Sequence, residues 1–121
     1  MRLLIVDDSN MIRQAIDTWS SAHGHQVVGH ARNGREALEM FESQRPDIVT
    51  LDITMPEMDG LEALDRMIAI QPDARIIVIS ALASKEVAIE AIKKGAATFV
   101  QKPITEAELI EAIEEVQGHG S

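Results

Sequence analysis

The sequence Ile48-Val49-Thr50-Leu51-Asp52 decides the fold expected for this chain, because it is a strand-sized, mostly apolar run that ends in a carboxylate. Similar short runs occur on both sides of it, and longer stretches with helical periodicity separate them. That alternation is typical of βα units around a parallel sheet covered by helices on both faces. The predicted strands are residues 3–6, 27–31, 48–51, 76–80 and 98–101.

The helical stretches place apolar residues three or four positions apart, so one face of each helix can pack on the sheet. The first helix is expected to begin after Ser9 or Asn10 and to stop at Gly24. The last opens with a capping pattern from Thr105 to Glu108. The residues expected to face the sheet are Ile12, Ala15, Ile16, Trp19, Leu38, Phe41, Leu61, Leu64, Ile68, Val87, Ala88, Ala91, Ile92, Leu109, Ile113 and Val116.

The composition indicates one ordinary globular domain. Of the 121 residues, 45% are hydrophobic and 26% are charged, which suffices for a packed core. A net charge of -9 and an aromatic content of 2% argue against nucleic acid as a partner. No apolar run is long enough to span a membrane, and the lack of cysteine fits a reducing compartment, so we expect a cytoplasmic protein. The domain is expected to cover residues 1–117, with a disordered tail at 118–121.

Polar side chains follow four of the predicted strands. Asp7 and Asp8 come after the first strand, Asp52 after the third, Ser80 ends the fourth, and Lys102 follows the fifth. Ligands of open parallel sheets bind outside the carboxyl ends of the strands, so these side chains should meet at one edge. A lone Asp after a strand is usually a helix cap, but Asp52 directly ends an apolar run and has no such explanation.

Three neighbouring carboxylates need a counter-charge. Two of them about 4 Å apart repel by roughly 4 kcal/mol at an effective dielectric constant of about 20, so the cluster must hold protons or a cation. Oxygen ligands without His or Cys favour Mg²⁺. With Lys102 and the metal neutralising phosphoryl oxygens and Ser80 donating a hydrogen bond, Asp52 is placed to attack phosphorus and form an aspartyl phosphate.

Four motifs give the chain a resemblance to a known family. They are Asp7-Asp8, Asp52-Ile53-Thr54-Met55-Pro56-Glu57-Met58-Asp59-Gly60, Ser80-Ala81 and Lys102-Pro103. In this order the chain resembles, from residue 2 to about residue 116, the receiver domains of two-component response regulators, most closely the free-standing chemotaxis (CheY-like) receivers. The resemblance implies an α/β fold of the flavodoxin-like (βα)5 type, a doubly wound parallel sheet with strand order 2-1-3-4-5, and a cis Lys102-Pro103 bond.

The resemblance also implies a role for each motif residue. Asp52 is the phosphoacceptor. The Mg²⁺ ligands are Asp7, Asp8, Asp52 and the carbonyl of Thr54, and the phosphoryl-binding residues are Ser80, Ala81 and Lys102. Ser80 and Phe99 form the conformational switch, and Thr54 and Leu82 tune the rate of hydrolysis.

The expected function is a signalling switch rather than an enzyme, although it catalyses its own phosphorylation and slow dephosphorylation. The resemblance implies a histidine kinase as phosphodonor, a possible phosphatase, and a protein target such as a flagellar motor switch component. The target would bind the face made by the fourth helix, the fifth strand and the fifth helix.

Two alternatives stay open. One is a Mg²⁺-dependent phosphatase with an aspartyl-phosphate intermediate, although Thr54 stands where such enzymes need a second acid. The other is a receiver cut from a longer regulator such as a chemoreceptor methylesterase, because residues 47–52 and 60–64 also resemble those receivers. A flavin or dinucleotide site is disfavoured, since no glycine-rich loop follows the first strand.

Overall fold

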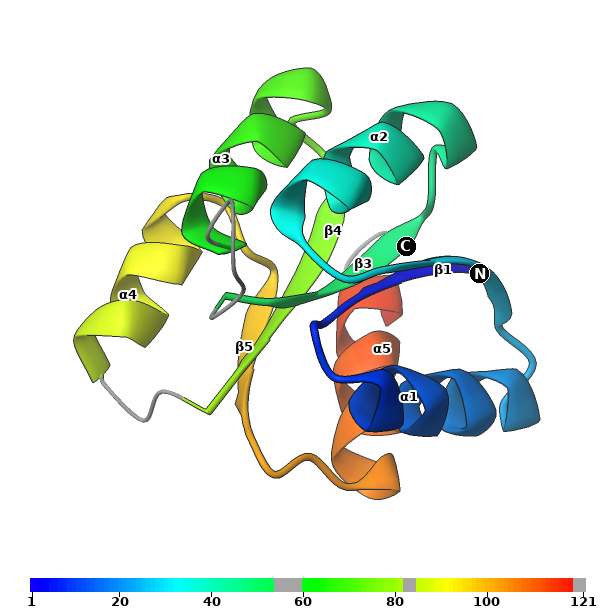
Figure 1. The fold of residues 1–121 in the computed structure, drawn as a ribbon. Coiled ribbons are helices and arrows are strands. Elements are labelled where there is room, and N and C mark those ends of the chain that lie inside the picture. The colour runs from blue at the N-terminus through cyan, green and yellow to red at the C-terminus, as the bar shows by residue number, and fades with distance from the viewer. Residues whose placement is uncertain (54–59, 82–84, 119–121) are drawn as a thin grey trace.

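The computed structural model describes residues 1–53, 60–81 and 85–118, and within them it shows a five-stranded parallel sheet with alternating helices (Figure 1). The strand order is β2-β1-β3-β4-β5, so the predicted fold class and order 2-1-3-4-5 are confirmed. The elements are β1 (Arg2–Val6), α1 (Asn10–Ala22), β2 (Gln26–Ala31), α2 (Gly34–Gln44), β3 (Ile48–Asp52), α3 (Gly60–Ile70), β4 (Arg75–Ser80), α4 (Lys85–Lys93), β5 (Thr98–Gln101) and α5 (Glu106–Gly118).

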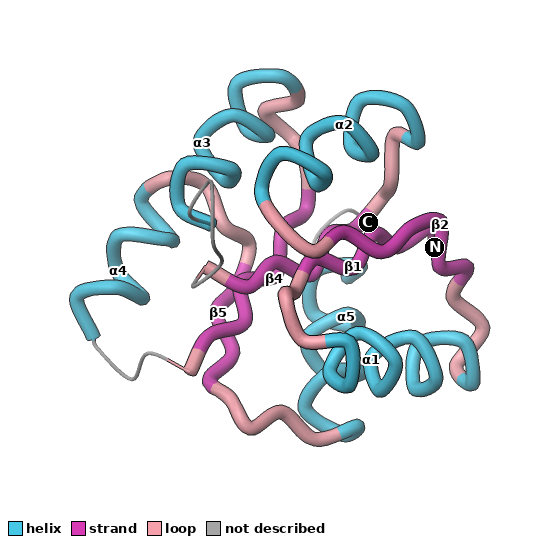
Figure 2. Tube along the Cα trace, in the orientation of Figure 1, coloured by secondary structure: helices cyan, strands magenta, loops and turns pink. Residues whose placement is uncertain are grey.

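The sheet lies between two layers of helices. Helices α1 and α5 cover one face, and α2, α3 and α4 cover the other (Figures 1 and 2). Alternate strand residues point to opposite faces, so β1 sends Leu3 and Ile5 into the cluster beneath α1 and α5, and Leu4 and Val6 into the other cluster. All five residues of β3 are buried, as expected of a central parallel strand.

The helix ends follow the predicted signals. Ser9 caps α1, its hydroxyl accepting a hydrogen bond from the amide of Ile12, and Gly24 follows with a φ of 87° that favours glycine. Thr105 and Glu108 cap α5 reciprocally. The expected tail lies, beyond Gly118, outside the described residues.

The predicted helix faces are mostly buried or half-buried, but the prediction for Ile92 is wrong. Ile92 is 48% exposed, because the neighbouring Ala91 takes the buried position and the next side chain is turned about 100° around the helix axis. Met67, which the prediction omitted, is fully buried in α3.

The start of α3 is packed against the end of β3. A Cβ atom at Gly60 would collide with the Cα atom of Ile53 and the carbonyl oxygen of Asp52. Glycine is therefore required where the helix approaches the strand that carries Asp52. Among the described helices, none combines the length and the apolar character needed to cross a bilayer.

Candidate functional site

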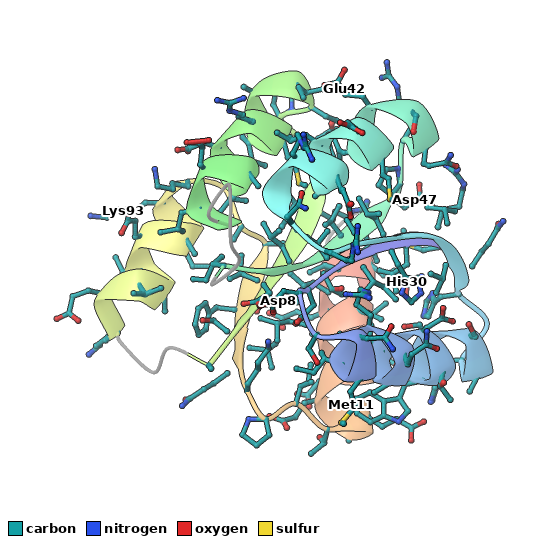
Figure 3. All side chains as sticks on the ribbon, viewed as in Figure 1. Asp8, Met11, His30, Glu42, Asp47 and Lys93 are labelled. Carbon is teal, nitrogen blue, oxygen red and sulfur yellow. The ribbon has the colours of Figure 1, made fainter. Side chains whose placement is uncertain are left out.

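Three carboxylates meet at the carboxyl ends of the central strands. Asp7 follows β1 directly, Asp8 lies beside it, and Asp52 is the last residue of β3. Figure 3 labels Asp8 where β1 ends. Each carboxylate offers one oxygen, and these oxygens lie within 4.8 Å of one another. Asp7 and Asp52 are each 1% exposed, whereas Asp8 is exposed, so the cluster is closed on the protein side and open at Asp8.

The Lys102 ammonium bridges the two buried carboxylates. Its Nζ lies 2.9 Å from Oδ2 of Asp7 and 3.4 Å from Oδ2 of Asp52. The Lys102 amide donates to the carbonyl of Ser80 over 2.8 Å, which ties the residue after β5 to the end of β4. The Lys102-Pro103 bond is cis, as the resemblance implied.

The remaining predicted site residues divide into two groups. Ser80 is fully buried at the end of β4, Ala81 is exposed beside it, and Phe99 is half-buried on β5 against the cluster beneath α2, α3 and α4. Thr54 and Leu82 lie outside the described residues. The structure therefore brings Asp7, Asp8, Asp52 and Lys102 together at one edge, with Ser80 linked to Lys102 through the backbone.

Arg13 of α1 is a site neighbour that sequence reasoning missed. Its guanidinium is buried, and Nη1 donates to the backbone carbonyl of Asp7 over 2.7 Å. The side chain of Asp7 is held as well, because the amide of Ser9 donates to its Oδ1 over 2.9 Å. The missed signal is helical position, because Arg13 lies three residues before the buried Ile16 on the inward face of α1.

The comparison with known proteins agrees with this arrangement. The family described as response regulator receiver domain matches residues 3–114 of the chain. The chain belongs to this family.

Several similar proteins are described as chemotaxis proteins. The receiver is 45% identical to the chemotaxis protein CheY of Thermotoga maritima, over 95% of this chain and 96% of that protein. It superimposes with a TM-score of 0.94, at 34% identity, on a structure described as the CheX-CheY-BeF3-Mg²⁺ complex from Borrelia burgdorferi, covering 97% of this chain and 89% of that one. It is also 47% identical to a protein-glutamate methylesterase/protein-glutamine glutaminase of Archaeoglobus fulgidus, over 85% of this chain but 30% of that protein.

Burial and neighbouring charges act in opposite directions on the pKa values of Asp7 and Lys102. Burial raises the pKa of Asp7, and the Asp52 charge adds to the rise, although hydrogen bonds from Lys102 and the Ser9 amide pull it down. For Lys102, burial lowers the pKa, but the hydrogen bond to Asp7 and the charges of Asp52 and Asp7 outweigh burial and leave it raised. Keeping Asp7 ionised thus costs the folded state free energy, whereas Lys102 keeps its proton and its positive charge.

This donor set fits Mg²⁺. The three clustered side chains supply carboxylate oxygens, which hard divalent cations prefer. The raised pKa of Asp7 shows that the single ammonium of Lys102 does not fully offset burial and repulsion in the cluster. A divalent cation on the exposed Asp8 side would supply the missing positive charge.

Proposed function

We propose that the chain is a phosphorylation-activated switch of a chemotaxis-type two-component system, acting in the cytoplasm and accepting a phosphoryl group from a histidine kinase onto Asp52. The observation that carries the proposal is the buried Asp52 carboxylate, held between an acidic pair and the Lys102 ammonium at the end of β3. A nucleophile in that place faces both the positive charge and the oxygen ligands that phosphoryl transfer needs.

In the transfer, an Asp52 carboxylate oxygen forms a bond to phosphorus as the P–N bond to the donor's imidazole breaks, and the imidazole nitrogen keeps the electron pair. Lys102 pairs with a phosphoryl oxygen, which it can reach from its place beside Asp52. Ser80 donates its hydroxyl hydrogen to another phosphoryl oxygen. Asp7, Asp8, Asp52 and the Thr54 carbonyl would hold Mg²⁺, which would supply positive charge to the phosphoryl oxygens and the carboxylates.

The phosphoryl group then signals through β4 and β5. A new dianion on Asp52 attracts Ser80 and Lys102, which are joined by the 2.8 Å backbone hydrogen bond. Because Ser80 pairs in register with Gln101, a shift of Ser80 is passed to β5, where Phe99 rotates inward. The face of α4, β5 and α5 changes shape, and a protein target such as a flagellar motor switch component binds it.

The family match favours this switch over a phosphatase. One other candidate function remains, a receiver within a longer regulator. Identity of 47% to a methylesterase, with only 30% of that protein covered, supports a receiver that belongs to a longer regulator. The mass of the intact protein from its native source separates the two. A mass near that of 121 residues supports the free-standing switch, and a much larger mass supports the longer regulator.

The test of the proposal is phosphorylation by a small-molecule acyl phosphate with Mg²⁺, followed by intact mass. We expect one phosphoryl group on the wild type and none on Asp52→Asn, because an amide is a poor nucleophile toward phosphorus. Asp73→Asn, which changes an exposed carboxylate away from the site, is the matched control and should label normally. Normal labelling of Asp52→Asn would overturn the assignment.

A further inference from the structure

A hollow runs along the open edge of the sheet at β5. It measures about 250 Å³, and all four β5 residues line it together with residues of α5. Successive strand side chains point to opposite faces, so a hollow lined by the whole strand follows the strand's outer edge. In the described sheet β5 pairs with β4 alone, and its other edge carries no strand. We call this hollow the β5 edge groove.

The α5 wall of the β5 edge groove is acidic. Glu108, Glu111 and Glu115 line it, and among the lining residues there is no Lys or Arg. Their spacing of three and four residues places them along one side of the helix. Of the three, Glu108 also caps the helix through Thr105.

The acidic wall carries a repulsion between like charges. Within the described part of the chain, Glu106 pairs with His23, but neither Glu111 nor Glu115 has an ion-pair partner. Residues 106–118 contain five Glu and neither Lys nor Arg. Glu111 and Glu115 stand four apart, where like charges destabilise a helix, whereas Glu62 and Arg66 of α3, in the opposite layer, form an attractive pair at that spacing. A cationic partner would relieve the repulsion on α5.

We propose that the target segment bound at the β5 edge groove is basic, with Lys or Arg side chains that reach the three carboxylates. This inference deepens the proposed function, because it names the chemistry of the target for the face of α4, β5 and α5. A hollow of this size admits side chains rather than a folded domain. The aliphatic stems of Lys or Arg can pack against the apolar residues that line the groove, Val100 and Ala112 among them, while their charged ends meet the acidic wall.

The experiment uses two synthetic peptides of equal length that share their Leu and Ala positions and differ in carrying Lys or Glu at the others. Each is titrated into the ¹⁵N-labelled chain, with acyl phosphate and Mg²⁺ and again in EDTA. We expect the Lys peptide to shift amides of β5 and of Glu108–Glu115, with an affinity that falls as salt rises. The Glu peptide should not bind there.

Two charge-reversal variants locate the effect. Glu111→Lys with Glu115→Lys should weaken the Lys peptide by about ten-fold, since two attractions become repulsions. Glu39→Lys with Glu42→Lys makes the same change of net charge on α2, in the opposite layer, and should leave affinity nearly unchanged. Equal weakening by both pairs, shifts that avoid β5 and α5, preference for the Glu peptide, or no binding of either peptide would each overturn the inference. Asp52 labelling is recorded in the same samples, so failed phosphorylation refutes the proposed function separately.

Discussion

The replacement Asp7→Asn should stabilise the chain in EDTA at neutral pH and weaken its binding of Mg²⁺. Asn keeps the shape of the side chain and can still accept the hydrogen bond from the Ser9 amide. The replacement removes the buried charge of a carboxyl group whose pKa is raised by burial and by the charge of Asp52. A raised carboxyl pKa means that the folded state holds the neutral form more tightly, so ionisation of Asp7 opposes folding.

The magnitude follows from the distances. At an effective dielectric constant of about 20, Lys102 at 2.9 Å attracts the Asp7 charge by about 6 kcal/mol. Asp52, with its oxygen within 4.8 Å, repels it by at least about 3.5 kcal/mol, and the exposed Asp8 adds a smaller, screened repulsion. Together these contributions leave at most about 2.5 kcal/mol of attraction, and burial of the charge, the largest cause of the raised pKa of Asp7, outweighs it and decides the sign. We expect a net gain of about 1 to 2 kcal/mol, or about 5 °C in Tm.

Urea denaturation between pH 3 and pH 8, in EDTA and in Mg²⁺, measures the effect. The advantage of Asp7→Asn should be absent well below pH 3.8, the ordinary pKa of the group, and grow as the pH rises through the higher folded value. Saturating Mg²⁺ should reverse the order by stabilising the wild type more, by about 2.7 kcal/mol at a hundred times Kd. A variant less stable than the wild type in EDTA at pH 7 would refute the charge argument. Asp8→Asn, which removes an exposed carboxylate, should lose Mg²⁺ affinity with little change in EDTA.

Three further changes have defined outcomes. Lys102→Met should lower the free energy of unfolding by about 3 kcal/mol in urea denaturation, because two buried carboxylates lose the ammonium beside them. The stabilisation that Lys102 gives the wild type should persist at neutral pH and vanish only above pH 10.5, since the pKa of Lys102 is raised. Gly60→Ala should lower both stability and the labelling rate of Asp52, because the added methyl group collides with the end of β3; circular dichroism melts and intact mass test this, and unchanged values in both would contradict it. Leu82→Glu and Thr54→Asn should speed loss of the phosphoryl group if water access limits hydrolysis, and dephosphorylation rates unchanged in both would show that it does not.

The sequence by itself determined the elements and the chemistry of their ends. Short apolar runs separated by helical periods leave few folds other than a parallel sheet between helices. The carboxyl ends of parallel strands share an edge, so residues such as Asp7 and Asp52 could be brought together without coordinates. The strand order needed the family resemblance, because periodicity does not state which strands are neighbours.

Tertiary packing decided the rest. An Arg on an amphipathic helix can be buried only where the surface packed against it provides a hydrogen-bond acceptor. For Arg13 that acceptor is the backbone carbonyl of Asp7. Ile92 is exposed although its spacing fits the buried face, because the small Ala91 fills the contact with the sheet. The β5 edge groove forms between α5 and the outermost strand, which lie side by side only in the folded chain. A local sequence pattern gives the type of each side chain and the side of the helix on which it lies. Burial and the balance of charge depend on groups distant in sequence, which come within a few ångströms only in the folded chain.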